Sequence, residues 1–409
     1  MTWLVVVLGL ALLVFLHELG HFSVSRLLGM KPRAFYIGFP PAIVKIERNG
    51  VEYGIGAIPL GGYTRIPGML RPSAGDFEAQ MSPALREDAA LVAAATNTVQ
   101  RQLGCGNLEA AREALPTLAT AVGQAALSPG ARRSAEQAVR GVDESTGADA
   151  YWRQPTWKRV AAIAAGPAMN VLVAFLLFFA VYATGAPSQI PSTEVAHIDA
   201  NTPAAAAGLR PGDRIVAVDG HPARSFAHVS ALIRGSHGHP ITVTVERAGL
   251  MVTLGPRRTI ERGGRWIWGF VPAAQLVSHP LGASARLAGG DCWHVVIGTA
   301  TAIRDLFRSH SSAGISGPIG VVRTSEQFLE IGLQWYLQLL GLISMSIALF
   351  NLLPLLPLDG GHILFSLVEG LRGRALPQAA YQRFSAFGMA LILLLTVIAF
   401  SNDLGATPR

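Results

Sequence analysis

The sequence predicts a polytopic α-helical membrane protein with about four transmembrane helices, a membrane-associated β-hairpin and an inserted β-rich domain. Half of the 409 residues are hydrophobic and only 14% are charged, whereas soluble domains usually contain about 25% charged residues. Four apolar stretches are long enough for a helix of about 20 residues to cross a bilayer. Between them lie segments that alternate apolar and polar residues, which indicates strands.

The four expected transmembrane helices occupy residues 1–26, 159–184, 331–358 and 384–402. The first stretch lacks the basic start and the small-residue cleavage site of a signal peptide, so we interpret it as a retained span. Lysine and arginine flank the loop between the first two spans and the loop at 359–383, and cytoplasmic loops are enriched in these residues. We therefore expect both loops in the cytoplasm, and both termini and the β-rich domain outside it.

Three segments between the spans are expected to fold outside the hydrocarbon layer. Residues 27–70 contain two strand patterns around Asn49-Gly50, a dipeptide that favours a tight hairpin turn. Gly61-Gly62-Tyr63 follows, where glycine permits close backbone approach. Residues 71–158 are rich in Ala, Arg and Glu and are expected to form a helical insert or a mobile loop. Residues 263–330 are expected to form a linker with amphipathic helices.

The β-rich domain is expected at residues 190–262, where "STEVAHI", "DRIVAVDG" and "ITVTVERAGLMVTL" are typical of strands. From Ala204 to Gly220 the sequence resembles the "AxxAGLxxGDxIxxVdG" pattern of PDZ domains. Such domains add an extended peptide to the edge of a sheet, so a peptide ligand is a further expectation. An ordinary small β domain is the alternative interpretation.

A polar cluster, "HELGH" at residues 17–21, lies near the end of the first apolar stretch. Residues four apart share one face of a helix, so His17 and His21 can bind one metal ion with Glu18 beside them. HExxH on a helix is typical of zinc proteases, in which the glutamate is the general base. An incidental polar patch is the alternative, although His and Glu that face lipid carry a free-energy penalty.

A third protein ligand is expected, because catalytic zinc usually takes three and leaves one position for water. Asp359 in "NLLPLLPLDGGH" is the best candidate, since it directly follows an apolar run. Pro354 and Pro357 prevent a regular helix there, and broken helices are tolerated where they line a cavity. Asp359 as an ordinary helix N-cap is the alternative. The two cysteines, Cys105 and Cys292, are too few for a thiolate zinc site.

Taken together, these motifs resemble the site-2 protease family of intramembrane zinc metalloproteases, and within it the bacterial RseP-type branch. "HELGH", "AGPAMN" (165–170), the PDZ-like block, "SGPIG" (316–320) and "NLLPLLPLDGGH" occur in the family's order. The resemblance covers about residues 3–70 and 155–402. It implies one Zn2+ per chain, held by His17, His21 and Asp359, with Glu18 as the catalytic base.

The resemblance also implies a set of substrate-binding residues: Gly61, Gly62 and Tyr63 in a membrane-dipping β loop, Asn170, and Asn351. It implies hydrolysis of a peptide bond within or near the transmembrane segment of single-span membrane proteins, such as anti-sigma factors or remnant signal peptides. The expected location is the bacterial inner membrane, with the active site toward the cytoplasmic side.

Two other functions are compatible with the residues. One is a catalytically silent membrane scaffold with a PDZ-like domain and a structural metal, but such a site needs a fourth ligand, and no further His or Cys is well placed. The other is a metal transporter, but transporters usually contain internal repeats, and this sequence shows none. The formal charge of +7 is spread over scattered basic residues, so we expect no nucleic-acid partner.

Overall fold

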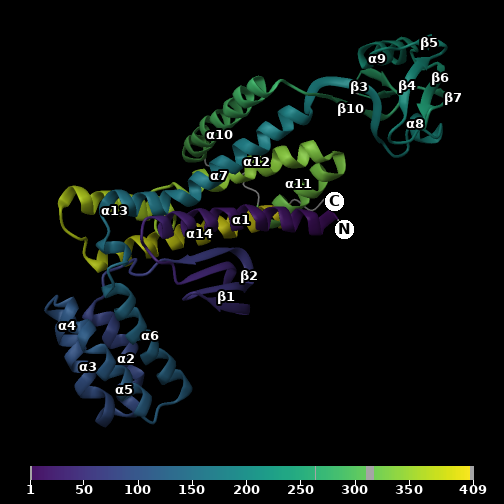
Figure 1. Cartoon of the computed structure of the whole chain (residues 1–409). Coiled ribbons are helices and arrows are strands. Elements are labelled where there is room, and N and C mark those ends of the chain that lie inside the picture. The colour runs from purple at the N-terminus through teal and green to yellow at the C-terminus, as the bar shows by residue number, and fades with distance from the viewer. Residues whose placement is uncertain (1, 263, 310–316, 406–409) are drawn as a thin grey trace. The chain divides into compact units, whose positions relative to one another are not determined.

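The computed structural model describes residues 2–262, 264–309 and 317–405. The chain divides into two compact units. The first comprises Met1–Ala174, Cys292–Arg323 and Leu342–Arg409, and the second comprises Phe175–Asp291 and Thr324–Gly341. Figure 1 labels the main helices and strands along the chain. Residues 263 and 310–316, which belong to the expected linker, lie outside the described residues.

Within the described residues, four helices are long and apolar enough to cross a membrane. They are α1 (Thr2–Leu27), α7 (Thr156–Thr184), α12 (Leu333–Asn351) and α14 (Gln378–Gly405). The prediction of a membrane protein with a β-rich region is confirmed. The third span is shorter than the expected 331–358, because the prolines that follow Asn351 cannot continue a helix.

A small sheet follows α1 in the first unit and is built from β1 (Ala34–Arg48) and β2 (Val51–Arg65). Asn49 and Gly50 form the turn with φ values of 54° and 74°, as a tight hairpin requires. Ala34 is aligned with both Glu52 and Arg65, so the two long strands bend into four short segments. Their order across the sheet is 62–65, 34–37, 52–55 and 44–48.

The expected insert at 71–158 is an ordered bundle with its own hydrophobic core. Its helices are α2 (Ala74–Glu87), α3 (Ala89–Gly104), α4 (Leu108–Glu113), α5 (Leu115–Gln124) and α6 (Pro129–Thr146). A single-turn helix follows at Tyr151–Arg153. Met81, Val92, Val99 and Leu118 are fully buried between the helices. Burial of this apolar surface explains why the segment is helical rather than an extended loop.

The second unit contains an antiparallel sheet in the order β10-β3-β4-β6-β7 around a core that includes Trp268. The strands are β3 (Ala186–Ile198), β4 (Arg214–Val218), β6 (Pro240–Arg247), β7 (Leu250–Arg258) and β10 (Phe270–Val277). Three shorter strands are β5 (His221–Pro222), β8 (Ile260–Arg262) and β9 (Arg265–Ile267). The domain also contains the helices α8 (Pro203–Ala206) and α9 (Phe226–Gly235).

Two features of this β domain differ from the sequence prediction. The strand β10 lies in the segment expected to be a linker, because it pairs with β3 and extends the sheet beyond 190–262. The helix α9 has no counterpart among the predicted elements; Ser225 caps its first turn, and Val229 and Ile233, four residues apart, are buried on one face.

The described residues also form the helices α10 (Leu281–Ser309), α11 (Pro318–Ile331) and α13 (Asp359–Arg372). The prediction that 359–383 is a loop is wrong for its first half, which forms α13. Gly360 and Gly361 let the start of this helix pack closely against the preceding segment. The helix ends at Gly373, whose φ of +64° is typical of a helix C-cap.

Candidate metal centre

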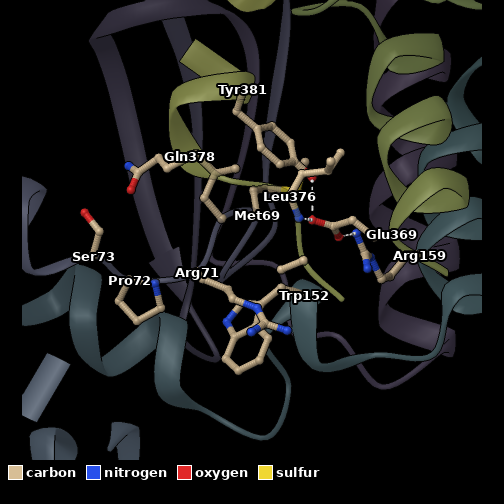
Figure 2. Close-up of a pocket in the computed structure, with 12 residues that line it drawn as sticks. Met69, Arg71, Pro72, Ser73, Trp152, Arg159, Glu369, Leu376, Gln378 and Tyr381 are labelled. Carbon is tan, nitrogen blue, oxygen red and sulfur yellow. Dashed lines mark hydrogen bonds and ion pairs between the residues drawn. The ribbon is translucent and has the colours of Figure 1, made fainter. Parts of the chain in front are cut away.

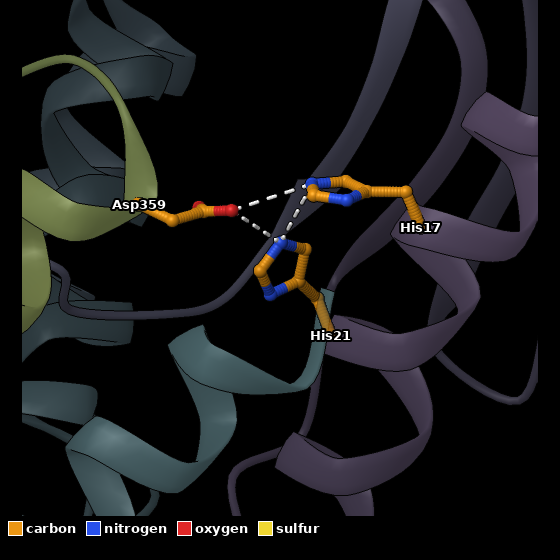
Figure 3. A group of neighbouring side chains, drawn as sticks. All are labelled: His17, His21 and Asp359. Atoms are coloured by element: carbon orange, nitrogen blue, oxygen red, sulfur yellow. Dashed lines mark hydrogen bonds and ion pairs between the residues drawn. The ribbon is translucent and has the colours of Figure 1, made fainter. Parts of the chain in front are cut away.

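Three side chains from two helices converge on one point in the first unit: His17 and His21 from α1, and Asp359 from α13 (Figure 3). The two Nε2 atoms lie 3.3 Å apart. Asp359 Oδ2 lies 3.3 Å from His17 Nε2 and 3.2 Å from His21 Nε2. Tetrahedral zinc, with bonds of about 2.0–2.1 Å, holds its ligands about 3.3 Å apart. The three atoms therefore have the spacing of three zinc ligands.

These three atoms are also sheltered from water. His17 and His21 are 8% and 7% exposed, and the buried Asp359 Oδ2 has no hydrogen bond within the described part of the chain. An unsatisfied buried carboxylate oxygen is costly unless a cation or a donor reaches it. The cluster therefore fits a metal ion chemically as well as geometrically.

The proton on His21 is fixed by the backbone of α7. His21 Nδ1 lies 3.0 Å from the carbonyl oxygen of Ala162. A carbonyl can only accept a hydrogen bond, so Nδ1 carries the proton and Nε2 presents a lone pair to the cluster. Metal-binding histidines usually make such a bond through their other ring nitrogen.

His17 has a comparable partner in Asn170, whose side chain is fully buried. Asn170 Nδ2 lies 3.3 Å from His17 Nδ1, while Asn170 Oδ1 has no hydrogen bond within the described residues. Turning the amide by 180° lets Oδ1 accept a hydrogen bond from the His17 Nδ1–H group and satisfies the orphaned oxygen. The structure thus places Asn170, a predicted substrate-binding residue, behind His17, where it orients the ring.

Close packing of α1 on α7 brings these partners together. A methyl group built on Gly166 would lie 2.2 Å from His21 Nε2, and one on Gly20 would lie 2.4 Å from the carbonyl oxygen of Ala165. Only glycine fits at either position without displacement of a neighbour. Gly166 belongs to the motif "AGPAMN", whose small residues also suit close helix packing.

Asp359 reaches the cluster because the chain folds back between α12 and α13. Asp359 is the first residue of α13 and Leu358 occupies the N-cap position, so Asp359 is not the ordinary N-cap considered above. A methyl group on Gly360 would lie 2.3 Å from the carbonyl oxygens of Leu352 and Leu353. The glycines after Asp359 therefore let α13 begin directly against the preceding segment.

Glu18 lies beside the small sheet, next to Gly62. A methyl group on Gly62 would lie 2.3 Å from Glu18 Cγ and 3.2 Å from its Oε1. Thr64 Oγ1 donates to the Glu18 backbone carbonyl at 3.3 Å. Gly61 adopts a φ of +134°, which side chains disfavour. The edge segment 62–65 is thereby held next to the glutamate of the HELGH motif.

Tyr63 lies on the opposite face of the sheet from Gly62, because successive side chains alternate in a strand. With Tyr36, Arg65 and Glu144, it lines a cleft of about 860 Å3 between the sheet and α6. Arg65 and Glu144 form an ion pair of 3.2 Å across this cleft. Tyr36 donates to Glu52, and burial together with this carboxylate raises the pKa of Tyr36 to about 12.

Asn351 is the last residue of α12 and is half-buried. Among the described residues, no hydrogen bond joins its side chain to the three metal-binding candidates. It lies eight residues before Asp359, at the start of the folded-back segment.

With this geometry established, the family can be identified. The sequence matches the model of peptidase family M50 over residues 5–395. The chain belongs to peptidase family M50. The resemblance to the site-2 protease family is thereby confirmed. This M50 peptidase is a zinc metalloendopeptidase, and its four apolar helices make it a multi-pass membrane protein.

Relatives of the M50 peptidase span almost its full length. The protein Atu1380 of Agrobacterium fabrum is 32% identical, over 98% of this chain and 94% of its own. Zinc metalloprotease RasP of Shouchella clausii is 28% identical over 96% of both chains. The regulator of sigma-W protease RasP of Bacillus subtilis is 26% identical, over 96% of this chain and 95% of its own.

Proposed function

We propose that this protein hydrolyses a peptide bond within or near the transmembrane segment of single-span membrane proteins. The observation that carries the proposal is the triangle of His17, His21 and Asp359 atoms, 3.2–3.3 Å apart, with Glu18 adjacent in the sequence. Two of the three residues lie in a helix that is apolar enough to span a bilayer. Chemistry at this depth requires a substrate that is itself in the membrane.

His17, His21 and Asp359 would hold the zinc ion and leave one coordination position for water or substrate. When bound, zinc polarises a carbonyl group and lowers the pKa of a bound water to about 7. Glu18 takes the proton of the attacking water and passes it to the leaving amine. Asn170 and the Ala162 carbonyl keep both imidazoles in the orientation that this chemistry needs.

A transmembrane substrate hides its peptide bonds within a helix, so it must unwind before hydrolysis. Segment 62–65 forms an edge of the small sheet beside Glu18, and an edge can accept an additional strand. Gly61 and Gly62 lack side chains that would keep this strand away from the glutamate. Tyr63 then lines the cleft on the face of the sheet opposite Glu18. Asn351, at the end of α12, would contact the substrate from the side of that helix.

The β domain is the proposed substrate filter, a PDZ-like module outside the cytoplasm that excludes membrane proteins with bulky external parts. One relative is named a regulator of sigma-W protease, which supports anti-sigma factors as a substrate class beside remnant signal peptides. The proposed location is a bacterial inner membrane, with the termini outside and the metal centre toward the cytoplasm.

A Glu18→Gln variant tests this function in the purified full-length protein. We expect it to retain one zinc ion per chain and to cleave a single-span model substrate about 10²–10⁴-fold more slowly, the usual contribution of a general base. Glu330→Gln, which changes an exposed glutamate of α11, serves as the matched control and should cleave at the parental rate. Parental cleavage by Glu18→Gln would exclude the proposed mechanism.

A further inference from the structure

One face of α7 contacts both histidines of the metal centre. The Ala162 carbonyl accepts a hydrogen bond from His21, Gly166 packs on the His21 ring, and Asn170 lies against His17. Arg159 precedes Ala162 by three residues and therefore lies on the same helix face. Its position suggests that the remaining ligand, Asp359, also depends on α7.

Arg159 joins α7 to α13, the helix that begins with Asp359. Arg159 Nη2 donates to Glu369 Oε2 at 2.6 Å, and the two side chains are 7% and 11% exposed (Figure 2). Glu369 Oε1 also accepts from the backbone N–H of Leu376 at 2.9 Å and from the Tyr381 hydroxyl at 3.4 Å. The carboxylate thus links α7, α13 and the start of α14.

A second set of contacts holds the same half of α13. Tyr151 lies beneath the Arg159 guanidinium, with its ring centroid 5.1 Å away, and its hydroxyl is 2.9 Å from Ser366 Oγ. A methyl group on Gly370 would lie 2.5 Å from Thr156 Oγ1, so the α13 backbone packs directly on the Thr156 side chain of α7. These contacts fix the end of α13 that is remote from Asp359.

A buried ion pair often stabilises a fold no more than well-packed apolar side chains would, because both charges lose water. What a hydrogen-bonded pair does supply is a defined geometry. Asp359 and Glu369 are ten residues apart, about 15 Å along a helix that rises 1.5 Å per residue. A tilt of α13 at Glu369 would therefore move Asp359, while zinc sites tolerate ligand distances within only about 0.2 Å.

We propose that Arg159 and Glu369 are positioning residues for the metal ligand Asp359. Their ion pair holds α13 against α7 so that the Asp359 carboxylate meets His17 and His21 at zinc-binding distance. The inference rests on the proposed metal centre and adds to it a residue pair with no contact to the metal.

The test uses the full-length protein in detergent, stripped of metal and titrated with Zn2+ against a chromophoric chelator. For Arg159→Lys and Glu369→Gln we expect the zinc dissociation constant to rise about 10–100-fold, as for other residues that orient a ligand. The absorption bands of the Co2+-loaded protein should also change, because they report ligand geometry. Arg112→Lys alters an exposed ion pair with Asp143 and should change neither.

Arg159→Lys is the variant most certain to fold, because it retains a charge for Glu369. A cavity of about 110 Å3 that borders both side chains also leaves room for a water molecule beside the shorter lysine. If both variants only lower the melting temperature of the metal-free protein, and keep the parental zinc affinity and cobalt spectrum, the pair is structural and the inference is wrong.

His17→Ala separates this inference from the proposed metal centre. If His17→Ala loses zinc while Arg159→Lys and Glu369→Gln bind it with parental affinity, only the positioning role is excluded. If His17→Ala itself binds zinc with parental affinity, the metal centre is wrong and the positioning role falls with it.

Discussion

Two aspartates with buried carboxylate oxygens, Asp213 in the β domain and Asp359 in the metal centre, have opposite surroundings. Asp213 is 1% exposed, and both of its oxygens accept hydrogen bonds from Arg247 at 2.7 Å, with a third from the Arg210 backbone at 2.8 Å. No lysine or arginine of the described residues pairs with Asp359, whose Oδ2 faces the two histidines.

Asp213 is therefore a structural carboxylate, whereas the carboxylate of Asp359 is arranged for a ligand. Arg247 compensates the charge of Asp213 fully, so the folded β domain needs nothing further there. No basic side chain of the described residues balances the charge of Asp359, so this carboxylate is available to a metal ion. Removing the partner of Asp213 should therefore damage the fold, whereas removing Asp359 should damage only metal binding.

Arg247→Met is expected to have the largest effect on stability. It leaves Asp213 buried without its cation, and breaking one side of a buried pair typically costs about 3–5 kcal/mol. Because the Arg247 side chain is 25% exposed, we expect the lower end of this range. Proteolysis of the full-length protein should show selective loss of the β domain, with zinc content unchanged. An intact β domain would mean that this pair is dispensable.

Gly166→Ala is expected to have a smaller effect, and on the other region. The new methyl group would displace the His21 ring, so zinc affinity should fall about 10–100-fold. Gly141→Ala in α6 is the matched control, since a methyl group there meets nothing within 4 Å. Alanine should stabilise that helix by up to about 1 kcal/mol. Equal zinc affinity in both variants would show that Gly166 does not constrain His21.

The smallest expected effect is a pH dependence of the β domain. Burial alone would raise the pKa of Asp213, but the hydrogen bonds from Arg247 and the Arg210 backbone outweigh it and hold the pKa below its ordinary value. A depressed pKa stabilises the fold above the unfolded value of about 3.9. This stability is lost as the pH falls through the folded pKa. Thermal unfolding should therefore show a loss of stability below about pH 4. The Asp213→Asn variant should not show this pH dependence.

The sequence was sufficient to predict the candidate ligands, because each has a local signal. His17 and His21 are one helical turn apart, and Asp359 follows two prolines that interrupt an apolar run. The turn at Asn49-Gly50 could also be predicted from a local signal, the Asn-Gly dipeptide itself. The prolines and the Asn-Gly turn restrict the backbone by residue type, and the histidine spacing depends only on a local helix, so no knowledge of distant contacts was needed.

The residues that support the ligands could not be predicted in this way. The acceptor for His21 is the backbone carbonyl of Ala162, and a carbonyl has no residue-type signal. Arg159 and Glu369 are 210 positions apart, and only the packed helices bring them together. The helix α13 was not predicted; it begins with Gly360 and Gly361, which have low helix propensity but pack directly on the backbone of the preceding segment.

Zinc content per chain, measured on the full-length parent and on Asp359→Ala, most directly tests the role of the metal centre. We expect one zinc ion per parental chain, a large loss in Asp359→Ala, and a protease-resistant β domain in both. Loss of the polarising metal should slow cleavage at least about 10³-fold, since its contribution is several kcal/mol. One zinc ion per chain and parental cleavage in Asp359→Ala would contradict the assignment of Asp359 as a ligand.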